Sequence, residues 1–321
     1  MSRFSTPAAL IDNQLHIVRT CLPRLRDGDA TSIHDARVAS RRIRELLRFA
    51  RAPIGDEWRE QFRTMGRALG RVRNVDVSLD LLQDLESRLP SAAPALVTLR
   101  HRQRDERLRR VRGPIKRLER LDAERFVDDL IAHSRHYGRG LLQGSAPRIW
   151  RRALEKLIAA RGESATEALV HSAGVYFPNR IHATRIALKK LRYSMEVANE
   201  IGAARYANSL RELRKGQQVL GELHDRQELL NDISNLGADD SHAALGLAQQ
   251  LIDAEIDDYH RRYLGRRERL FKIARDAQAP RLSHVWHLPS LAVASAVAMS
   301  SGAYVMQRRL VPRPNMTTNV A

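Results

Sequence analysis

Apolar residues recur at steps of three and four positions along almost the whole chain, the spacing that places them on one face of an α-helix. There is no sustained run of alternating β-branched residues, the pattern typical of strands. Clusters of Pro and Gly separate the expected helices at residues 51–57, 88–95, 112–116, 138–148, 174–180, 235–241 and 278–284. The pattern predicts an all-α protein.

Two of the expected helices carry the same arrangement of residues. The stretch IHDARVASRRIRELLR at 33–48 matches IHATRIALKKLRYSME at 181–196, with a histidine followed by cations at the same steps. A second pair, ALGRVRNVDV at 68–77 and VLGELHDRQE at 219–228, shares a Leu-Gly step at nearly the same offset. An internal duplication of a helical unit explains both matches, and we expect the two halves to join near 138–148.

The chain is strongly basic. Its 321 residues include 55 Lys and Arg against 37 Asp and Glu, a formal net charge of +18, and only six of these cations are Lys. Such a field attracts polyanions, and Arg binds phosphate through a planar fork of donors that Lys lacks. A GC-rich coding sequence would produce the same excess of Arg and Ala, so composition alone leaves open whether the partner is acidic.

The cations of each repeated stretch share one helix face. At about 100° per residue they fall within a narrow arc, with Ala, Ile and Leu on the opposite side. The arcs hold His34, Arg37, Arg41, Arg44 and Arg48 in the first copy and His182, Arg185, Lys189 and Arg192 in the second. Like charges at this spacing repel, so stability alone does not explain two such faces, and each would suit a linear polyanion.

The alternative is that these faces are solvated and neutralised by acidic residues. Two candidates for local neutralisation are Glu45 beside Arg41 and Glu196 beside Arg192. Sequence alone leaves both explanations of the faces open.

The two histidines each follow a good N-cap residue by three positions. Thr31 precedes His34, and Asn179 precedes His182. Both histidines would then lie in a first helical turn, where the helix dipole disfavours imidazolium and the free N–H groups favour an anion. A structural role at the helix end and direct contact with a ligand both stay open.

Neither catalysis nor a cofactor is expected from these stretches. No His-x3-His or Cys pair accompanies the histidines, so we predict no metal site. The cationic faces carry few carboxylates to hold a metal or activate water, and the Gly-rich pattern of a P-loop is absent. The single cysteine, Cys21, suits a reducing cytoplasm, and the N-terminal residues lack the apolar run of a signal peptide.

One segment near the C-terminus has the length of a membrane span. Residues 288–307 carry no charge and are followed by Arg308 and Arg309. The segment consists mainly of Ala, Ser and Gly, whose insertion into a bilayer is marginal. We therefore expect a helix packed on protein and no membrane partner.

The two histidine stretches, each followed by a Leu-Gly element, resemble the CHAD domain, the conserved histidine α-helical domain. The resemblance covers residues 8–275, with an N-terminal half at 8–140 and a C-terminal half at 145–275, and leaves 276–321 as an extension. It implies two pseudo-symmetric bundles of roughly four helices each, whose basic helices face a central cleft or pore. No start of a CYTH domain precedes the motifs, so we expect the CHAD domain to stand alone.

The resemblance also implies a function. Domains similar to this one bind inorganic polyphosphate without turnover and go to polyphosphate granules in the cytoplasm; nucleic-acid binding through the phosphate backbone is the alternative. Carried over to this chain, the polyphosphate-binding positions are His34, Arg37, Arg41, Arg42, Arg44, Arg48, Arg73, His182, Arg185, Lys189, Lys190 and Arg192. The chain departs from the family pattern at Asn74, where an Asp is usual, whereas the second copy keeps Asp225.

Overall fold

The computed structural model describes residues 7–48, 54–120, 147–200, 206–235 and 242–279. Within these ranges it contains eight α-helices, one short 3-10 helix and no strand. The helices are α1 (Pro7–Arg26), α2 (Ala30–Leu46), α3 (Ile54–Arg88), η1 (Pro90–Ala92), α4 (Ala93–Arg120), α6 (Pro147–His171), α7 (Pro178–Glu200), α8 (Ala207–Ser234) and α9 (His242–Asp276). The expected all-α class is confirmed over the described residues.

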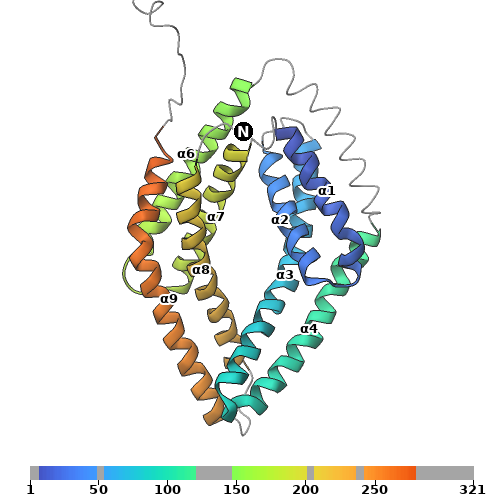
Figure 1. Ribbon diagram of the computed structural model, residues 1–321, viewed down its shortest axis with the longest axis vertical. Coiled ribbons are helices and arrows are strands. Elements are labelled where there is room, and N and C mark those ends of the chain that lie inside the picture. The colour runs from blue at the N-terminus through green and yellow to red at the C-terminus, as the bar shows by residue number, and fades with distance from the viewer. Residues whose placement is uncertain (1–6, 49–53, 121–146, 201–205, 236–241, 280–321) are drawn as a thin grey trace, which may run out of the picture. The chain divides into compact units, whose positions relative to one another are not determined.

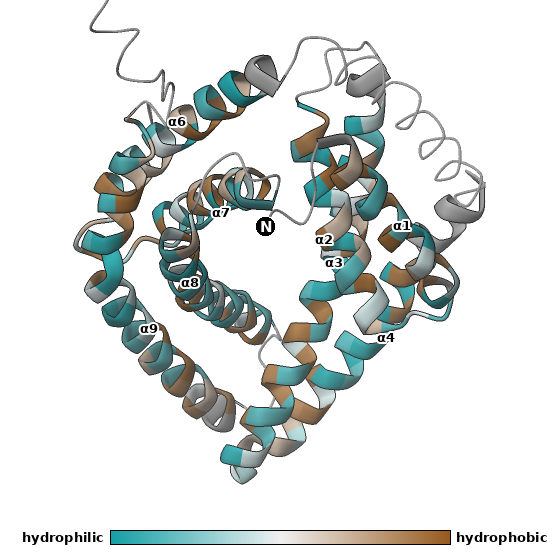
Figure 2. Cartoon of the chain, turned by 45° about the horizontal axis from the view of Figure 1, so that its top comes forward, coloured by the Kyte–Doolittle hydropathy of each residue, from teal (hydrophilic) through white to brown (hydrophobic). Residues whose placement is uncertain are grey.

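The first repeated stretch forms α2. The side chain of Asp29 caps this helix by accepting a hydrogen bond from the Ser32 N–H at 2.8 Å. The expected apolar side of the helix is buried, at Ala36, Ala39, Ile43, Leu46 and Leu47. Each buried Leu or Ile contributes roughly 1.5–3 kcal/mol, so this side holds α2 in place and leaves the opposite side to the cations. Figure 2 shows apolar and polar sides on the helices.

The second repeated stretch forms α7 and is built in the same way. Its expected apolar residues, Ala187, Leu188, Leu191 and Met195, are buried. Tyr193 and Glu196 are buried as well. These two polar side chains require partners inside the protein, and both find cations.

One expected helix boundary is wrong. The stretch RGPIK at 112–116 was expected to separate two helices, but α4 continues through it to Arg120. Proline removes one backbone hydrogen bond and favours a kink, and a long helix can keep its remaining bonds on either side. Pro23 is accommodated inside α1 in the same manner.

The helices pack in two groups (Figure 1). Helices α1 to α4 contact one another in chain order, as do α6 to α9, and α6 also packs on α9. The first group has a core around Ile33, Ile43 and Phe62, and the second has one around Leu188 and Tyr263. Two groups agree with the duplication read from the sequence, which stays a prediction.

The groups meet at two places. A third core combines Leu82 and Leu96 of the first group with Ile233 and Ile252 of the second. Near the other end, α2 contacts α7. These contacts bring the later parts of the two cationic helices together, as the pairs Arg42–Glu200 and Arg41–Tyr193 show.

By its internal contacts the chain divides into Met1–Pro280 and Arg281–Ala321. The second unit, including segment 288–307, lies outside the described residues, as does the expected joint near 138–148. Of the helices that are described, none combines the length and apolar character that crossing a bilayer requires.

Candidate functional site

The cations of α2 lie against α3 and α7. Arg37 is half-buried, and within the described chain its Nε has no hydrogen-bond partner. This nitrogen approaches α3 closely, because a Cβ at Gly70 would lie only 3.3 Å from it. Arg41 donates a hydrogen bond from Nη1 to the Tyr193 hydroxyl of α7 at 2.5 Å.

The cations of α7 face them. Arg185, Lys189 and Arg192 are all half-buried. The Arg192 guanidinium lies over the Tyr193 ring, 4.9 Å from its centroid, and that of Arg41 lies 5.4 Å from the same centroid. Tyr193 therefore holds one cation from each helix by cation–π interaction.

These residues act on one another electrostatically. Burial, together with the charges of Arg41, Arg185 and Arg73, lowers the pKa of Arg37 to about 10. Burial, opposed in part by Asp225, also lowers the pKa of Arg185. We call this set the cationic cluster: Arg37 and Arg41 of α2, Arg73 of α3, and Arg185, Lys189 and Arg192 of α7.

The pKa of Lys189 reflects both its burial and the positive charges around it. Burial, reinforced by the charges of Arg41, Arg185, Arg37 and Arg192, lowers the pKa of its amine to about 6. Desolvation and nearby like charges both disfavour an ammonium ion. At pH 7 the amine is therefore mainly neutral in the unliganded protein.

Most carboxylates around the cluster are engaged by other cations. Glu45 pairs with Arg161 of α6 inside the protein. Glu196 lies 3.2 Å from Nη2 of Arg214 and 3.8 Å from Nε of Arg192. The expected pairing of Glu196 with Arg192 is present, but Glu45 is directed to Arg161 and not to Arg41.

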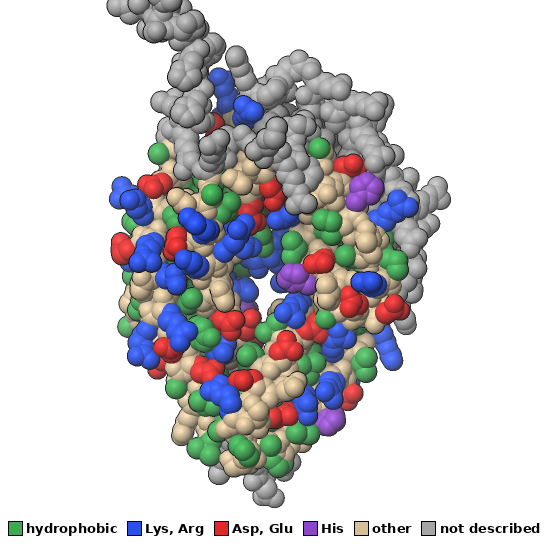
Figure 3. Space-filling model, in the orientation of Figure 1, with side chains coloured by type: hydrophobic (Ala, Val, Ile, Leu, Met, Phe, Trp, Pro, Cys, Tyr) green, Lys and Arg blue, Asp and Glu red, His purple; other side chains and the backbone are tan. Residues whose placement is uncertain are grey.

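Asp225 of α8 is a carboxylate that acts on the cluster directly. Burial raises its pKa, while Arg185 and Arg73 lower it. Glu228 also acts on Arg185, and Glu196 lies near Arg192, so the five arginines of the cluster outnumber the carboxylates that act on them. The cluster thus keeps an excess of positive charge in a partly desolvated place, and Figure 3 shows Lys and Arg side chains gathered around the hollow in this view.

The cluster continues into a pocket between α2 and α3. The pocket has a volume of about 300 Å³. It is lined by Arg37, Ser40, Arg41 and Arg44 of α2 and by Gly66, Arg67, Gly70, Arg71 and Asn74 of α3. No carboxylate is among these lining residues, so five guanidinium groups surround one small space.

Two of these arginines, Arg67 and Arg71, are absent from the set predicted from the sequence. They sit one turn apart on α3, just before and within the Leu-Gly element. That spacing was a usable signal, because it puts both on one helix face. Asn74, which replaces the usual Asp, also lines this pocket, and it adds no negative charge to it.

The histidines lie deeper in their helices than expected. Because α2 begins at Ala30 with Asp29 as its cap, Thr31 is not the N-cap. The helix α7 likewise begins at Pro178, before Asn179. His34 and His182 are therefore each the fifth residue of a helix, past the free N–H groups, and a capping role does not apply.

His182 has a partner that the sequence did not indicate. Its exposed ring lies 5.0 Å from the ring of His224 of α8. Burial lowers the pKa of His224 to about 4, with help from Arg185, His182 and Lys189. His224 therefore borders the cationic cluster as a neutral ring.

Three predicted residues lie apart from the cluster. Arg42 pairs with Glu200 of α7 at 3.3 Å. Arg48 is exposed and pairs with Glu45 at 3.6 Å. Lys190 has an exposed side chain. The remaining predicted cations of the two helices lie in the cluster or, for Arg44, in its pocket.

No group of three or more metal-ligating side chains occurs among the residues that the structure describes. Guanidinium groups, a buried amine and a tyrosine hydroxyl are suited to phosphate oxygens.

Comparison with known proteins places the chain among characterised folds. The family model described as "CHAD domain" matches residues 9–230. The chain is similar to the crystal structure of the CHAD domain from the plant Ricinus communis, at 19% identity and a TM-score of 0.58, covering 88% of this chain and 94% of that one. It is also similar to PptA from Streptomyces chartreusis, at 14% identity and a TM-score of 0.55, covering 86% and 100%. A comparison with curated proteins found no match.

Proposed function

Because the chain belongs to the CHAD domain family, we propose that it binds inorganic polyphosphate at the cationic cluster and in the adjoining pocket between α2 and α3. The single observation that carries the proposal is the convergence of unneutralised cations from two helices. Arg37 and Arg41 of α2 meet Arg185 of α7 and the amine of Lys189, and Asp225 and Glu228 are the carboxylates that act on Arg185.

Repulsion among the partly buried cations of the cluster favours the binding of an anionic ligand. Holding like charges together at a partly desolvated place costs free energy. A polyanion offsets this cost, releases counterions and accepts hydrogen bonds from the guanidinium groups.

A linear ligand fits the layout of the cations. Arg37, Arg41 and Arg44 follow one another by about one helical turn, roughly 5.4 Å. Arg67 and Arg71 run along α3 beside them. A chain of phosphates can contact successive arginines, whereas a single small anion would leave most of them unpaired.

We propose binding without turnover, with the protein directed to cytoplasmic polyphosphate granules through its ligand. Hydrolysis or phosphoryl transfer requires carboxylates that hold a metal or activate water. Glu45 and Glu196 are instead engaged by Arg161 and Arg214. These pairs support a binding role.

Nucleic acid is the competing ligand, and Tyr193 argues against recognition of single strands. Single-strand binders stack bases on exposed aromatic rings. The Tyr193 ring is buried and already lies beside two guanidinium groups. Duplex binding through phosphate contacts is an outcome that the experiment distinguishes.

The test is a titration with long-chain polyphosphate, duplex DNA and single-stranded DNA at several salt concentrations. The test variant changes Arg37, Arg41, Arg185 and Lys189 to Ala, and the control changes four exposed cations, Arg102, Arg104, Arg109 and Arg261, to Ala. We expect the test variant to lose at least about a hundredfold in polyphosphate affinity, since each Arg–phosphate contact contributes roughly 1.5–3 kcal/mol. The control should lose much less.

Two results would contradict the proposal. Equal losses in the two variants would mean that net charge alone drives binding. Equal affinity for the three polymers, with the same salt dependence, would mean that the cluster has no preference for polyphosphate.

A further inference from the structure

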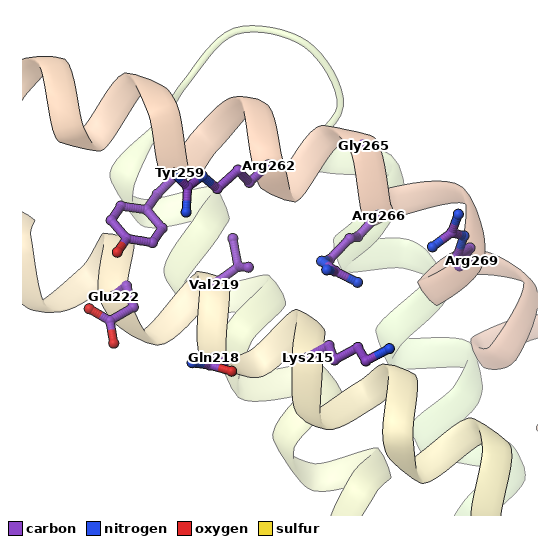
Figure 4. A pocket seen from close by; sticks show the side chains of 9 residues that line it. All are labelled: Lys215, Gln218, Val219, Glu222, Tyr259, Arg262, Gly265, Arg266 and Arg269. Atoms are coloured by element: carbon purple, nitrogen blue, oxygen red, sulfur yellow. The ribbon is translucent and has the colours of Figure 1, made fainter.

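A second basic pocket lies between α8 and α9 (Figure 4), with a volume of about 540 Å³. It is lined by Lys215, Gln218, Val219 and Glu222 of α8 and by Tyr259, Arg262, Gly265, Arg266 and Arg269 of α9. Neither repeated histidine stretch contributes to it. The α9 cations follow one another at steps of four and three residues, which places them on one face of the helix.

The two ends of this pocket differ in chemistry. At one end Lys215, Arg266 and Arg269 lie near one another, and Tyr259, Arg262 and Glu222 lie at the other end (Figure 4). Gln218 and Val219 form the α8 side between the two ends. A ligand would thus meet three cations at one end and, at the other, an aromatic ring, a carboxylate and Arg262, whose charge is paired with Asp258.

The cationic end keeps donors available for an anion. Glu212 pairs with Lys215 at 3.2 Å and with Arg266 at 3.6 Å. Its carboxylate is shared between these two residues and also acts on Arg269. Three cations around one carboxylate leave a net positive charge where a phosphate group could accept hydrogen bonds.

The other end is arranged for neutral polar groups. Glu222 accepts a hydrogen bond from Arg226 at 2.7 Å, which neutralises it. The guanidinium groups of Arg226 and Arg262 lie 4.5 Å and 5.1 Å from the centroid of the Tyr259 ring. This end offers carboxylate and hydroxyl oxygens, which accept hydrogen bonds from amino or hydroxyl groups.

We propose that the pocket between α8 and α9 binds a small phosphorylated ligand with an uncharged polar body, of the class of nucleoside triphosphates. Its phosphates lie between Lys215, Arg266 and Arg269, and its body extends along Gln218 and Val219 toward Glu222. A pocket of about 540 Å³ has the size of ordinary small-molecule sites.

Gly265 keeps this pocket open. A Cβ added at Gly265 would meet no atom within 4 Å, so the residue borders free space. A large side chain placed there would fill the pocket without removing a charge. Replacing Gly also favours the helix, so the change should not unfold the protein.

The site is separate from the cationic cluster, and its test does not depend on polyphosphate binding. His224, on α8, faces Arg185 and Lys189 of the cluster, whereas Lys215 and Glu222 face α9. ATP is therefore titrated calorimetrically into a background variant, Arg37→Ala with Arg185→Ala, in which the cluster is weakened. Tripolyphosphate, which lacks the nucleoside, and adenosine, which lacks the phosphates, are titrated for comparison.

In that background we expect ATP to bind more tightly than tripolyphosphate and adenosine to bind weakly or not at all. Gly265→Tyr and Arg269→Ala should each weaken ATP binding about tenfold or more. Arg261→Ala is the matched control, because Arg261 is an exposed α9 cation outside the pocket, and it should leave ATP binding unchanged.

Three results would overturn the assignment. No ATP binding in the background variant would remove the site. ATP binding that survives both Gly265→Tyr and Arg269→Ala would place it elsewhere. Tripolyphosphate binding as tightly as ATP would show that the pocket does not recognise an uncharged body.

Discussion

Lys189 is the residue of the cationic cluster whose pKa falls below neutral pH. Its amine is buried among Arg37, Arg41, Arg185 and Arg192, and burial with these charges lowers its pKa to about 6. A bound polyanion would supply the missing negative charge and raise that pKa toward the usual value of about 10.4. Ligand binding and protonation of Lys189 are therefore coupled.

This coupling gives a prediction for pH. Between about pH 6 and the raised pKa of the complex, Lys189 takes up a proton on binding, so polyphosphate affinity should fall by up to about tenfold per pH unit as pH rises. Calorimetry at pH 7 in two buffers of different ionisation enthalpy measures the proton uptake directly.

The control for this prediction is Lys189→Arg, which keeps the charge at all these pH values. His182, His224, Asp225 and Tyr193 also face the cluster, so any uptake that persists in the variant belongs to them. Unchanged proton uptake in Lys189→Arg would refute the role of Lys189.

The ligand-free protein should respond to pH in the opposite direction. The folded pKa of Lys189 lies below its unfolded value, so the unfolded chain binds more protons between about pH 6 and pH 10.4. The contribution of Lys189 to the free energy of unfolding therefore rises with pH across this window. Thermal unfolding of the wild type and Lys189→Met at pH 7 and pH 9 would measure this contribution. The difference in free energy of unfolding between the two proteins should shrink as pH rises.

At the scale of elements, the two Leu-Gly steps are alike in sequence and different in structure. Gly70 on α3 lies against Arg37, since its Cβ would be 3.3 Å from the Arg37 Nε. Gly221 on α8 would place a Cβ where no atom lies within 4 Å. Only the first glycine makes room for a cation of the cluster.

Alanine at each glycine tests this difference. Gly221→Ala should raise the free energy of unfolding by roughly 0.5–1 kcal/mol, because Ala favours a helix more than Gly does, and should leave polyphosphate binding unchanged. Gly70→Ala should shift Arg37 and weaken polyphosphate binding several-fold. Chemical denaturation and ligand titration measure the two effects, and equal behaviour of both variants would contradict the assigned role of Gly70.

At the scale of the whole described unit, one buried ion pair links the two helix groups. Arg161 of α6 donates to Glu45 of α2 and also to the Lys190 carbonyl of α7, the latter at 2.7 Å. This side chain thus contacts both cationic helices near the cluster. The pair holds α2 beside α7, which is the arrangement that brings the cations together.

Breaking this pair should be costly. Glu45→Gln leaves the Arg161 charge buried without its carboxylate, so the free energy of unfolding should fall by about 3 kcal/mol. The control is Glu60→Gln, which removes an exposed pair with Arg63 and should change stability far less, because solvent screens such a pair. Similar small effects in both variants, measured by denaturation, would show that the link between the groups lies elsewhere.

The sequence by itself determined the all-α class and which residues share each helix face. Helix geometry depends on neighbours three and four residues away, so the buried side of α2 and the shared face of Arg37, Arg41 and Arg44 could be derived from spacing alone. The doubled histidine stretch and the Leu-Gly steps also sufficed to indicate the family. The helix start at Asp29 and the continuity of α4 were missed, because several local signals compete at such positions.

Only the tertiary structure decided which cations stay unneutralised. Arg42 and Arg48 are on the predicted stretch, yet Glu200 and Glu45 pair with them. Arg67 and Arg71 enter the site from α3, a different segment of the chain. Ion pairing and desolvation depend on residues that are distant in sequence and near in space, so helix periodicity can assign a cation to a face but cannot tell what lies opposite it.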